Sequence, residues 1–259
     1  MDRSASVAEE AGRSWHVLSQ ASDKGSAACN EDIAGAARTC AWIVDGSAFF
    51  NGTARTIDES EGAWFVRRID AALRADPPDD VPFAVWAEGL EQQLQRDYAA
   101  LGHGHPEREA GEGPSAVFGL VRLRSAGDIC RIEGALIGDV SILIRDGDRI
   151  ERWTDPSAGP FEAKTIAAAT ADGHRPGEVV SANALAQILR NRRSLNRPGG
   201  YWAINPGLSW RAGLRLFSAE ISPQATVLLA SDGFMRLVDV IAHHDEAGLM
   251  EAVERLGVA

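Results

Sequence analysis

Apolar positions along the chain fall into two patterns, which together predict both helices and strands. Stretches 58–75 and 82–101 place apolar side chains at helical spacing and predict two consecutive helices. Asp58 is a candidate N-cap for the first, and Pro82 suits the first turn of the second. Further helices are expected at 161–171, at 178–193 and in the C-terminal region.

Short apolar or alternating runs, bounded by turn residues, predict the strands. The runs lie at 15–19, 39–45, 115–124, 129–138, 140–145, 149–153, 214–219 and 226–231. Asp146-Gly147 is a two-residue hairpin signal between two of them. We expect the last two runs to form a strand pair.

Strands therefore cluster with strands, and helices come in pairs between them. This order predicts an α+β fold with antiparallel sheets covered by helices, because a parallel fold would alternate strand and helix. The chain has 259 residues, 45% of them hydrophobic, which is enough for one large core. We expect a flexible N-terminal lead-in over 1–14 and a single domain over 15–259.

Composition argues against several kinds of partner and compartment. The net charge of -11 would repel nucleic acid phosphates, so nucleic acid is not expected as a partner. There is no run of about 18 apolar residues, so no membrane helix is expected. The N-terminus lacks a secretory signal, and three widely spaced cysteines predict reduced thiols. We therefore expect a cytoplasmic protein.

Carboxylates stand where apolar runs begin or stop. Asp45, Asp139 and Asp232 each follow an apolar run, and Glu31 and Asp32 precede one. Any one of these motifs alone is typical of an ordinary turn. If the ends of buried strands converge, however, the carboxylates would repel one another unless a cation lay between them. Hard divalent cations such as Mg²⁺ and Mn²⁺ prefer such oxygen ligands.

The ordered motifs resemble those of a known family. Asn30-Glu31-Asp32, Val44-Asp45-Gly46, Gly138-Asp139 and Ala230-Ser231-Asp232-Gly233 occur in the order seen in the protein phosphatase 2C family, the metal-dependent serine/threonine protein phosphatases. The resemblance spans about residues 19–239 and is greatest to compact bacterial members. It implies a four-layer α-β-β-α sandwich, with two antiparallel sheets flanked by helices.

The resemblance also implies an activity and a set of site residues. The reaction would be hydrolysis of phosphoserine and phosphothreonine esters by water activated by two metals, Mn²⁺ or Mg²⁺. The substrate would be a phosphoprotein, and the enzyme would oppose a serine/threonine kinase. Asp45 and Asp232 would be catalytic. The metal ligands would be Glu31, Asp32, Asp45, Gly46, Asp139 and Asp232.

Each of these ligands has a separate implied role. Asp45 would bridge both metals, and the Gly46 carbonyl would assist at one of them. Glu31 and Asp232 would bind the other metal, and Asp32 would hold metal-bound waters. Asp139 would lie near a weaker third metal position.

The sequence departs from the family pattern at three places. Ala27 stands where many members have a phosphate-binding Arg, and Ser47 stands where many have a His after the Asp-Gly. Lys24 or Arg55 are weak replacements for the Arg, so the substrate-binding residues are unknown. A final Asp-bearing strand is also lacking, which would weaken one metal site and leave an unpaired sheet edge.

These departures leave two alternatives to a protein phosphatase. One is a catalytically weak or inactive relative that acts as a binding or regulatory module. The other is a phosphatase of a small metabolite, since no motif separates protein from metabolite substrates.

Overall fold

A computed structural model describes residues 14–25, 28–48, 60–101, 112–126, 129–173 and 181–258. Its strands form two antiparallel sheets, a five-stranded one in the order β1-β2-β3-β4-β7 and a three-stranded one in the order β6-β5-β8. The strands are β1 (Asp32–Ala36), β2 (Cys40–Ser47), β3 (Ser115–Ala126), β4 (Ile129–Ile137), β5 (Ser141–Asp146), β6 (Arg149–Trp153), β7 (Arg215–Ile221) and β8 (Thr226–Ala230).

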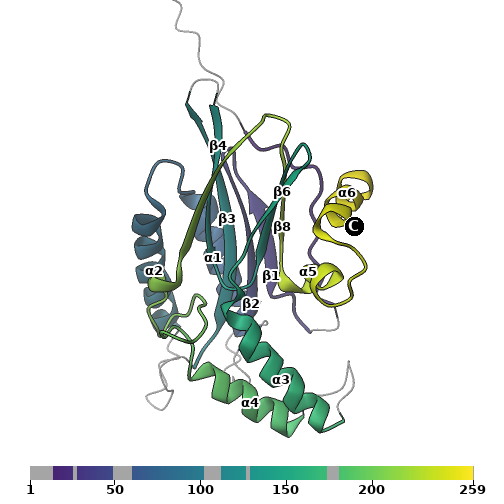
Figure 1. The fold of residues 1–259 in the computed structure, drawn as a ribbon. Coiled ribbons are helices and arrows are strands. Elements are labelled where there is room, and N and C mark those ends of the chain that lie inside the picture. Colours follow the sequence, from purple (N-terminus) through teal and green to yellow (C-terminus); the bar gives the residue numbers. More distant parts are fainter. Residues whose placement is uncertain are drawn as a thin grey trace, which may run out of the picture.

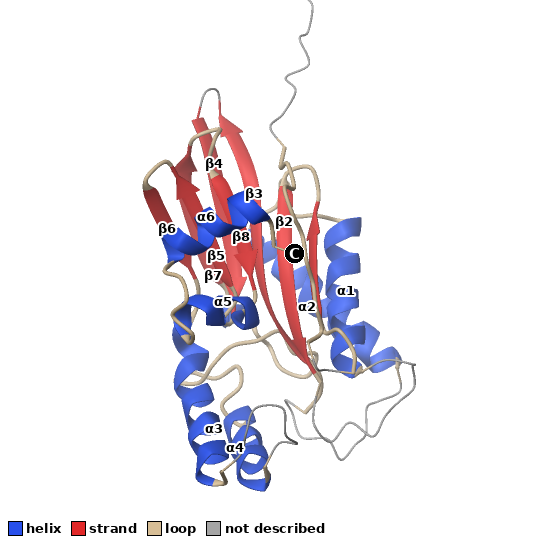
Figure 2. Ribbon diagram, turned by 90° about the vertical axis from the view of Figure 1, so that its right-hand side faces the viewer, coloured by secondary structure: helices blue, strands red, loops and turns tan. Residues whose placement is uncertain are grey.

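Six α-helices accompany the sheets in the described residues. They are α1 (Glu61–Ala75), α2 (Phe83–Ala100), α3 (Gly159–Ala171), α4 (Ala182–Arg192), α5 (Asp232–Asp239) and α6 (Glu246–Leu256). Helices α1 and α2 cover one side of the sandwich, and α5 and α6 cover the other (Figures 1 and 2). The predicted α+β fold with four α-β-β-α layers is confirmed.

Three apolar clusters correspond to the three interfaces between the layers. Trp42, Val44 and Phe118 pack toward α1 and α2. The second cluster lies between the two sheets. The third cluster, around Leu143 and Met250, lies under α5 and α6. Successive side chains of a strand point to opposite faces of the sheet, so β2 contributes to two clusters. Trp42 belongs to the first cluster, and its neighbour Ile43 packs against the second.

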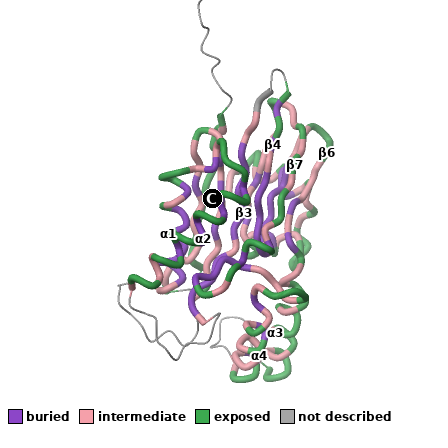
Figure 3. Tube along the Cα trace, turned by 90° about the vertical axis from the view of Figure 1, so that its left-hand side faces the viewer, coloured by how far each residue is buried: buried purple, intermediate pink, exposed green. Residues whose placement is uncertain are grey.

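The pair formed by α3 and α4 stands apart at one end of the sandwich (Figure 1). Figure 3 shows few buried positions in this pair, in contrast to the strands. Helix α3 has no buried residue, and α4 buries Ala184 and Asn191. The two helices contact each other, and Asn191 joins them by donating to the Phe161 carbonyl at 2.9 Å.

The expected pairing of the last two strands is wrong. Strand β7 pairs with β4 in the larger sheet, and β8 pairs with β5 in the smaller one. The short segment between them crosses from one sheet to the other. Asp146 at the end of β5 holds this crossing, because its carboxylate accepts bonds from the Ser222 backbone N–H at 3.0 Å and from the Ser222 hydroxyl at 2.5 Å.

The expected strand at 15–19 is also absent from the described structure, where this segment has no regular secondary structure. It is held near both ends: the Trp15 backbone N–H donates to the Arg38 carbonyl at 3.0 Å and its indole to the Thr39 carbonyl at 2.8 Å, and the Ser19 hydroxyl accepts from the Val258 backbone N–H at 3.1 Å. Val17 and Leu18, between these two residues, are exposed. An extended segment without a ladder of bonds to a neighbour does not count as a strand.

Smaller differences concern turns and caps. The β5–β6 hairpin forms, but Asp146 pairs with Arg149, so the turn residues are Gly147 and Asp148. Ser60 caps α1, because its hydroxyl accepts from the Ala63 backbone N–H; the predicted cap, Asp58, lies outside the described residues. All three cysteines are free, as expected. Among the described helices, none has the length and apolar character needed to cross a membrane.

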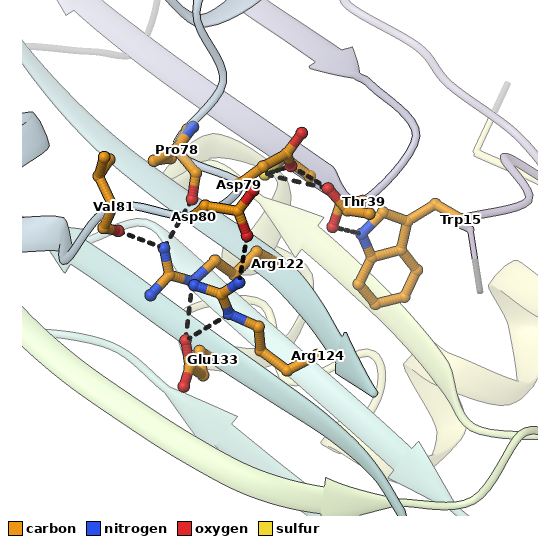
Figure 4. A network of polar contacts seen from close by, with 10 residues as sticks. Trp15, Thr39, Pro78, Asp79, Asp80, Val81, Arg122, Arg124 and Glu133 are labelled. Atoms are coloured by element: carbon orange, nitrogen blue, oxygen red, sulfur yellow. Dashed lines mark hydrogen bonds and ion pairs between the residues drawn. The ribbon is translucent and has the colours of Figure 1, made fainter. Parts of the chain in front are cut away.

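A buried arginine joins the α1–α2 connection to the larger sheet (Figure 4). Arg122 on β3 donates to the carbonyls of Pro78 and Val81 at 2.6 Å each and to the Glu133 carboxylate at 2.7 Å. Its guanidinium also lies 4.0 Å from the centre of the Phe83 ring. The charge is thus satisfied in a buried place, and the start of α2 is held at the opposite end of the strands from the aspartates.

Candidate active site

Strand register brings two of the candidate carboxylates side by side. In the β1–β2 pair, Asp32 lies directly opposite Asp45. Asp45 is in turn opposite Val117 of β3, whose neighbour Phe118 pairs with Ile137 at the end of β4. Asp139 follows that end after one glycine.

A glycine is required between β4 and Asp139. Gly138 has φ 80°, and a Cβ on it would lie 2.0 Å from a methyl carbon of Val117. The left-handed backbone and this close approach favour Gly alone. They let β4 turn at the level of Asp45, so Asp139 reaches the same rim of the sheet.

Asp232 comes to this rim from the second sheet. Strand β8 ends at Ala230, Ser231 is the N-cap of α5, and Asp232 is the first residue of that helix. Asp232 is exposed, whereas Asp32, Asp45 and Asp139 are partly buried. The group of four aspartates is therefore open to solvent on one side.

The pKa values show how strongly the four aspartates interact. Burial, followed by repulsion from Asp32, Asp232 and Asp139, raises the pKa of Asp45 to about 9. Burial and the charge of Asp232 raise the pKa of Asp139 to about 6. Burial also raises the pKa of Asp32, although a hydrogen bond with Asp45 opposes this. Asp45 is thus the member of the group that most resists ionisation without a cation.

Glu31 lies beside this group but is used differently. The charge of Glu31 contributes to the raised pKa of Asp32, so the two carboxylates lie close together. Both of its carboxylate oxygens accept hydrogen bonds at the start of α1, one from the Ser60 hydroxyl and one from the Ala48 backbone N–H at 3.1 Å. A Cβ on Gly62 would lie 2.7 Å from its carboxyl carbon, so the helix packs closely on it.

Gly46 is required by packing at the end of β2. A Cβ there would lie 2.4 Å from a methyl carbon of Val66 and 2.7 Å from the Glu31 carbonyl oxygen, to which the Gly46 N–H donates at 2.9 Å. The Asp-Gly motif therefore has a structural reason independent of any metal. That its carbonyl binds a metal stays a prediction.

The donor set fits a divalent cation in part. Four aspartates with mutual repulsion offer the hard oxygen ligands that Mg²⁺ and Mn²⁺ prefer. In the described part of the chain, however, no three His, Cys, Asp or Glu side chains are already placed as a metal-binding set. The predicted ligand Glu31 would also have to leave its partners at α1.

Two residues that the sequence did not single out lie near the rim. The Arg192 guanidinium, at the end of α4, approaches the Ser47 hydroxyl at 3.5 Å. Tyr201 lies within electrostatic range of both Arg192 and Asp139, since their charges shift its pKa in opposite directions. The separation of 145 positions between Arg192 and Ser47 explains why no local motif indicates this approach.

Other polar candidates can now be placed. Ala27 and Arg55 lie outside the described residues. Lys24 is exposed and donates to the Ala28 carbonyl at 3.3 Å.

Other polar residues near the C-terminus serve the packing of α5 and α6. Asp239 binds Arg152 through two contacts of 2.7 Å, and Asp245 caps α6. His243 and His244 lie in the loop before α6, with their ring centroids 4.6 Å apart.

A cavity of about 710 Å³ lies away from the aspartates. It separates the segment around Trp15 and Leu18 from strand β8, and apolar residues such as Ile43, Val227 and Val258 line it. None of the four aspartates contributes to its walls. It is therefore a separate feature from the candidate site.

Comparisons with known proteins bear on the fold. No family model and no curated protein matches the sequence. Among solved structures, the serine/threonine phosphatase PstP/Ppp of Mycobacterium tuberculosis is 17% identical, with a TM-score of 0.55 and coverage of 92% of this chain and 85% of that one.

Two further structures agree with this match. The catalytic domain of PstP in complex with two manganese ions is 15% identical, with a TM-score of 0.52 over 90% of this chain and 82% of that one. The serine/threonine phosphatase Stp1 of Staphylococcus aureus is 14% identical, with a TM-score of 0.50 over 89% and 82%. Identities this low establish the architecture alone: the chain has the fold of the protein phosphatase 2C family of metal-dependent serine/threonine phosphatases.

Proposed function

We propose that this protein is a metal-dependent phosphatase that hydrolyses phosphoserine and phosphothreonine esters of phosphoproteins in the cytoplasm, opposing a serine/threonine kinase. The observation that carries the proposal is the convergence of four aspartates on one rim, with Asp45 at their centre. Such a group is unfavourable by itself and favourable around divalent cations. The matched structures belong to serine/threonine phosphatases, which supports the same reaction class.

Asp32, Asp45, Asp139 and Asp232 would hold Mn²⁺ or Mg²⁺. When bound, the cations supply an activated water and neutralise charge on the phosphoryl group. Asp45 would contribute most, because it interacts with each of the other three. Exposed Asp232 would lie on the side from which a substrate enters. Glu31 would serve as a ligand after giving up its bond from Ser60.

The direct test combines turnover and stability. With millimolar Mn²⁺, we expect phosphate release from phosphoserine or phosphothreonine peptides and from a generic aryl phosphate. The same Mn²⁺ should raise the melting temperature, because the folded state alone assembles the site. Absence of turnover at saturating Mn²⁺ would contradict the proposed phosphatase activity. An unchanged melting temperature would contradict the proposed metal site.

A second function, a non-catalytic binding module, is favoured by one observation. Glu31, a predicted ligand, is held at the start of α1 by hydrogen bonds to both oxygens. A protein of this kind would bind Mn²⁺ or a phosphopeptide and release no phosphate. A phosphopeptide that is bound and recovered intact would support this function over the enzyme.

A further inference from the structure

Strand β8 has one unpaired edge, and this edge faces the apolar cavity. The strand pairs with β5 on its other side and, among the described residues, with no further backbone group. All five of its residues line the cavity, whereas no residue of β5 belongs to the described walls. The backbone N–H and C=O groups on this edge therefore point into a largely apolar space, where unpaired polar groups are unfavourable.

A second segment with unpaired backbone groups borders the same cavity. Residues 16–20 line it, and in the described structure their backbone groups make no hydrogen bond. The sequence predicts a strand at 15–19, and the structure has none there because no neighbouring strand pairs with this segment. An extended chain placed between β8 and this segment would find backbone partners on both of its sides.

The two remaining walls of the cavity are apolar. Ala34 and Ile43, which are cross-strand neighbours in the larger sheet, contribute to one of them. Met250 and Val253 contribute to the other, and they belong to α6, which crosses over the smaller sheet in Figure 2. A strand in the cavity would thus be buried on both faces. Strands of this kind are continuous apolar runs, whereas a strand with one exposed face alternates apolar and polar residues.

Charge determines which residues suit the ends of such a run. Glu254 is the only carboxylate on the described walls, and it is already paired with Arg145 at 2.9 Å, so a charged residue inside the cavity would lack a free counter-ion. Both ends of the cavity are acidic. Asp232 directly follows the lining residues at the end of β8, and Asp146 binds lining Ser222 before its start. Basic flanking residues are therefore favourable, and acidic ones are repelled.

We propose that β8 and residues 16–20 together bind an extended segment of another protein, which adds to the smaller sheet as a strand. The segment is a run of about five apolar residues, matching the length of β8, between basic residues. A second copy of this chain is a weaker occupant, because each copy carries a net charge of -11 and the two repel each other. A small apolar molecule would fill the cavity without pairing the backbone on either side. The docking site does not depend on the proposed phosphatase activity.

The experiment uses the full chain and a synthetic peptide of five valine and isoleucine residues between terminal lysines. Three matched peptides are the controls: one has proline at its centre, one has serine at every second apolar position, and one has glutamates in place of the lysines. Calorimetry measures the affinity of each peptide. Hydrogen exchange measures the protection of the backbone N–H groups in β8 and in residues 16–20.

We expect the valine–isoleucine peptide to bind most tightly and to slow hydrogen exchange in both segments. The proline peptide should bind at least about tenfold more weakly, because proline lacks a backbone donor and does not fit the interior of a sheet. The serine peptide should also bind more weakly, because it would bury hydroxyl groups without partners. The glutamate peptide should bind more weakly because both ends of the cavity are acidic.

Two variants of β1 test where the peptide binds. Ala34→Phe places a ring in the cavity and should abolish binding. Ile33→Phe is the control, because this neighbouring side chain points to the other face of β1, packs against the first apolar cluster and does not line the cavity. Thermal melts verify that both variants are folded. The peptide series and hydrogen exchange need no variant, so they decide the matter even if Ala34→Phe does not fold.

Equal affinities for the valine–isoleucine and proline peptides would overturn the inference. Peptide binding without added protection of β8 would overturn it as well, as would undiminished binding by folded Ala34→Phe. An apolar dye that binds in the cavity and is not displaced by the peptide would indicate a small-molecule site and contradict strand addition. None of these measurements involves phosphate release, so the proposed phosphatase activity is tested separately.

Discussion

Asp32 lies directly opposite Asp45 in the β1–β2 ladder, and the two carboxyl groups share a hydrogen bond. Like charges opposite each other across a strand pair destabilise the sheet, and such a bond requires a proton on one of the two groups. Asp45 is the one that keeps its proton to higher pH, because burial raises its pKa most and Asp139 and Asp232 repel it too. The end of β2 is therefore built around a carboxyl group that a cation would deprotonate.

Asp45→Asn should have opposite effects on activity and on stability. Turnover should fall by roughly a hundredfold or more, since several kcal/mol of transition-state stabilisation depend on the bound cations. In the metal-free protein near neutral pH, the same change should raise the melting temperature, because the Asp45 carboxyl group must take up a proton on folding and an amide need not. Asp148→Asn, in the exposed β5–β6 turn, is the control and should change neither. Retention of most activity by Asp45→Asn would remove Asp45 from the mechanism.

The metal-free protein should lose stability as the pH rises. Asp45, Asp139 and Asp32 have raised pKa values when folded, so between about pH 4 and pH 9 the folded state binds more protons than the unfolded state. Each group can lower the free energy of unfolding by at most about 1.4 kcal/mol per pH unit within its own window. Urea unfolding in the presence of a chelator at several pH values measures how the free energy of unfolding changes with pH.

Two comparisons make this pH prediction sharper. Asp45→Asn should flatten the slope, mainly above pH 6, where Asp45 still holds its proton and Asp139 has lost its own. With saturating Mn²⁺ the free energy of unfolding should instead rise with pH, because protons then compete with the cation for the carboxylates. A stability that is independent of pH in the chelator would show that the aspartates do not repel one another.

Much of this end of the sandwich could be predicted from sequence, because its signals are local. Apolar runs that stop at Asp-Gly or Gly-Asp predict strand ends, and the resemblance supplied their order around Asp45, Asp139 and Asp232. What could not be predicted depends on contacts distant in sequence. The assignment of β7 and β8 to different sheets depends on Asp146 holding Ser222, and the approach of Arg192 to Ser47 depends on how α4 packs.

Glu31 should stabilise the metal-free protein, in contrast to Asp45. Glu31→Ala removes two acceptors at the start of α1 and should cost about 1–2 kcal/mol of unfolding free energy. In a double-mutant cycle with Ser60→Ala, the two losses should be less than additive, because they share one hydrogen bond. Chemical denaturation in a chelator measures all three variants. A gain in stability for Glu31→Ala would mean that repulsion from Asp32 outweighs the helix contacts.

Arg122 should matter more to stability than any exposed arginine of the larger sheet. Arg122→Met keeps the apolar stem, removes the guanidinium and leaves the Pro78 and Val81 carbonyls without their donor, at a cost of roughly 3 kcal/mol. Arg131→Met on β4 is the control: its partner is exposed Glu220 at 3.3 Å, and such pairs contribute less than about 1 kcal/mol. Equal losses in denaturant midpoint for the two variants would contradict this difference.

The two edges of the smaller sheet differ in charge, and this predicts where the protein self-associates. Edge strand β6 carries Arg149, Glu151 and Arg152, and charged side chains oppose strand addition. Edge strand β8, with the sequence TVLLA, carries none, and in the described residues it pairs with β5 alone. The apolar cavity beside β8 leaves room for an added strand.

We therefore expect concentration-dependent association through β8, measurable by sedimentation velocity. Thr226→Lys should weaken it, because a lysine on the edge must be desolvated when another strand pairs there. Gln224→Lys adds the same charge in the turn before β8 and should leave association unchanged. A protein that stays monomeric at all concentrations would contradict association through β8. If both lysine variants weaken association equally, net charge rather than strand pairing governs it.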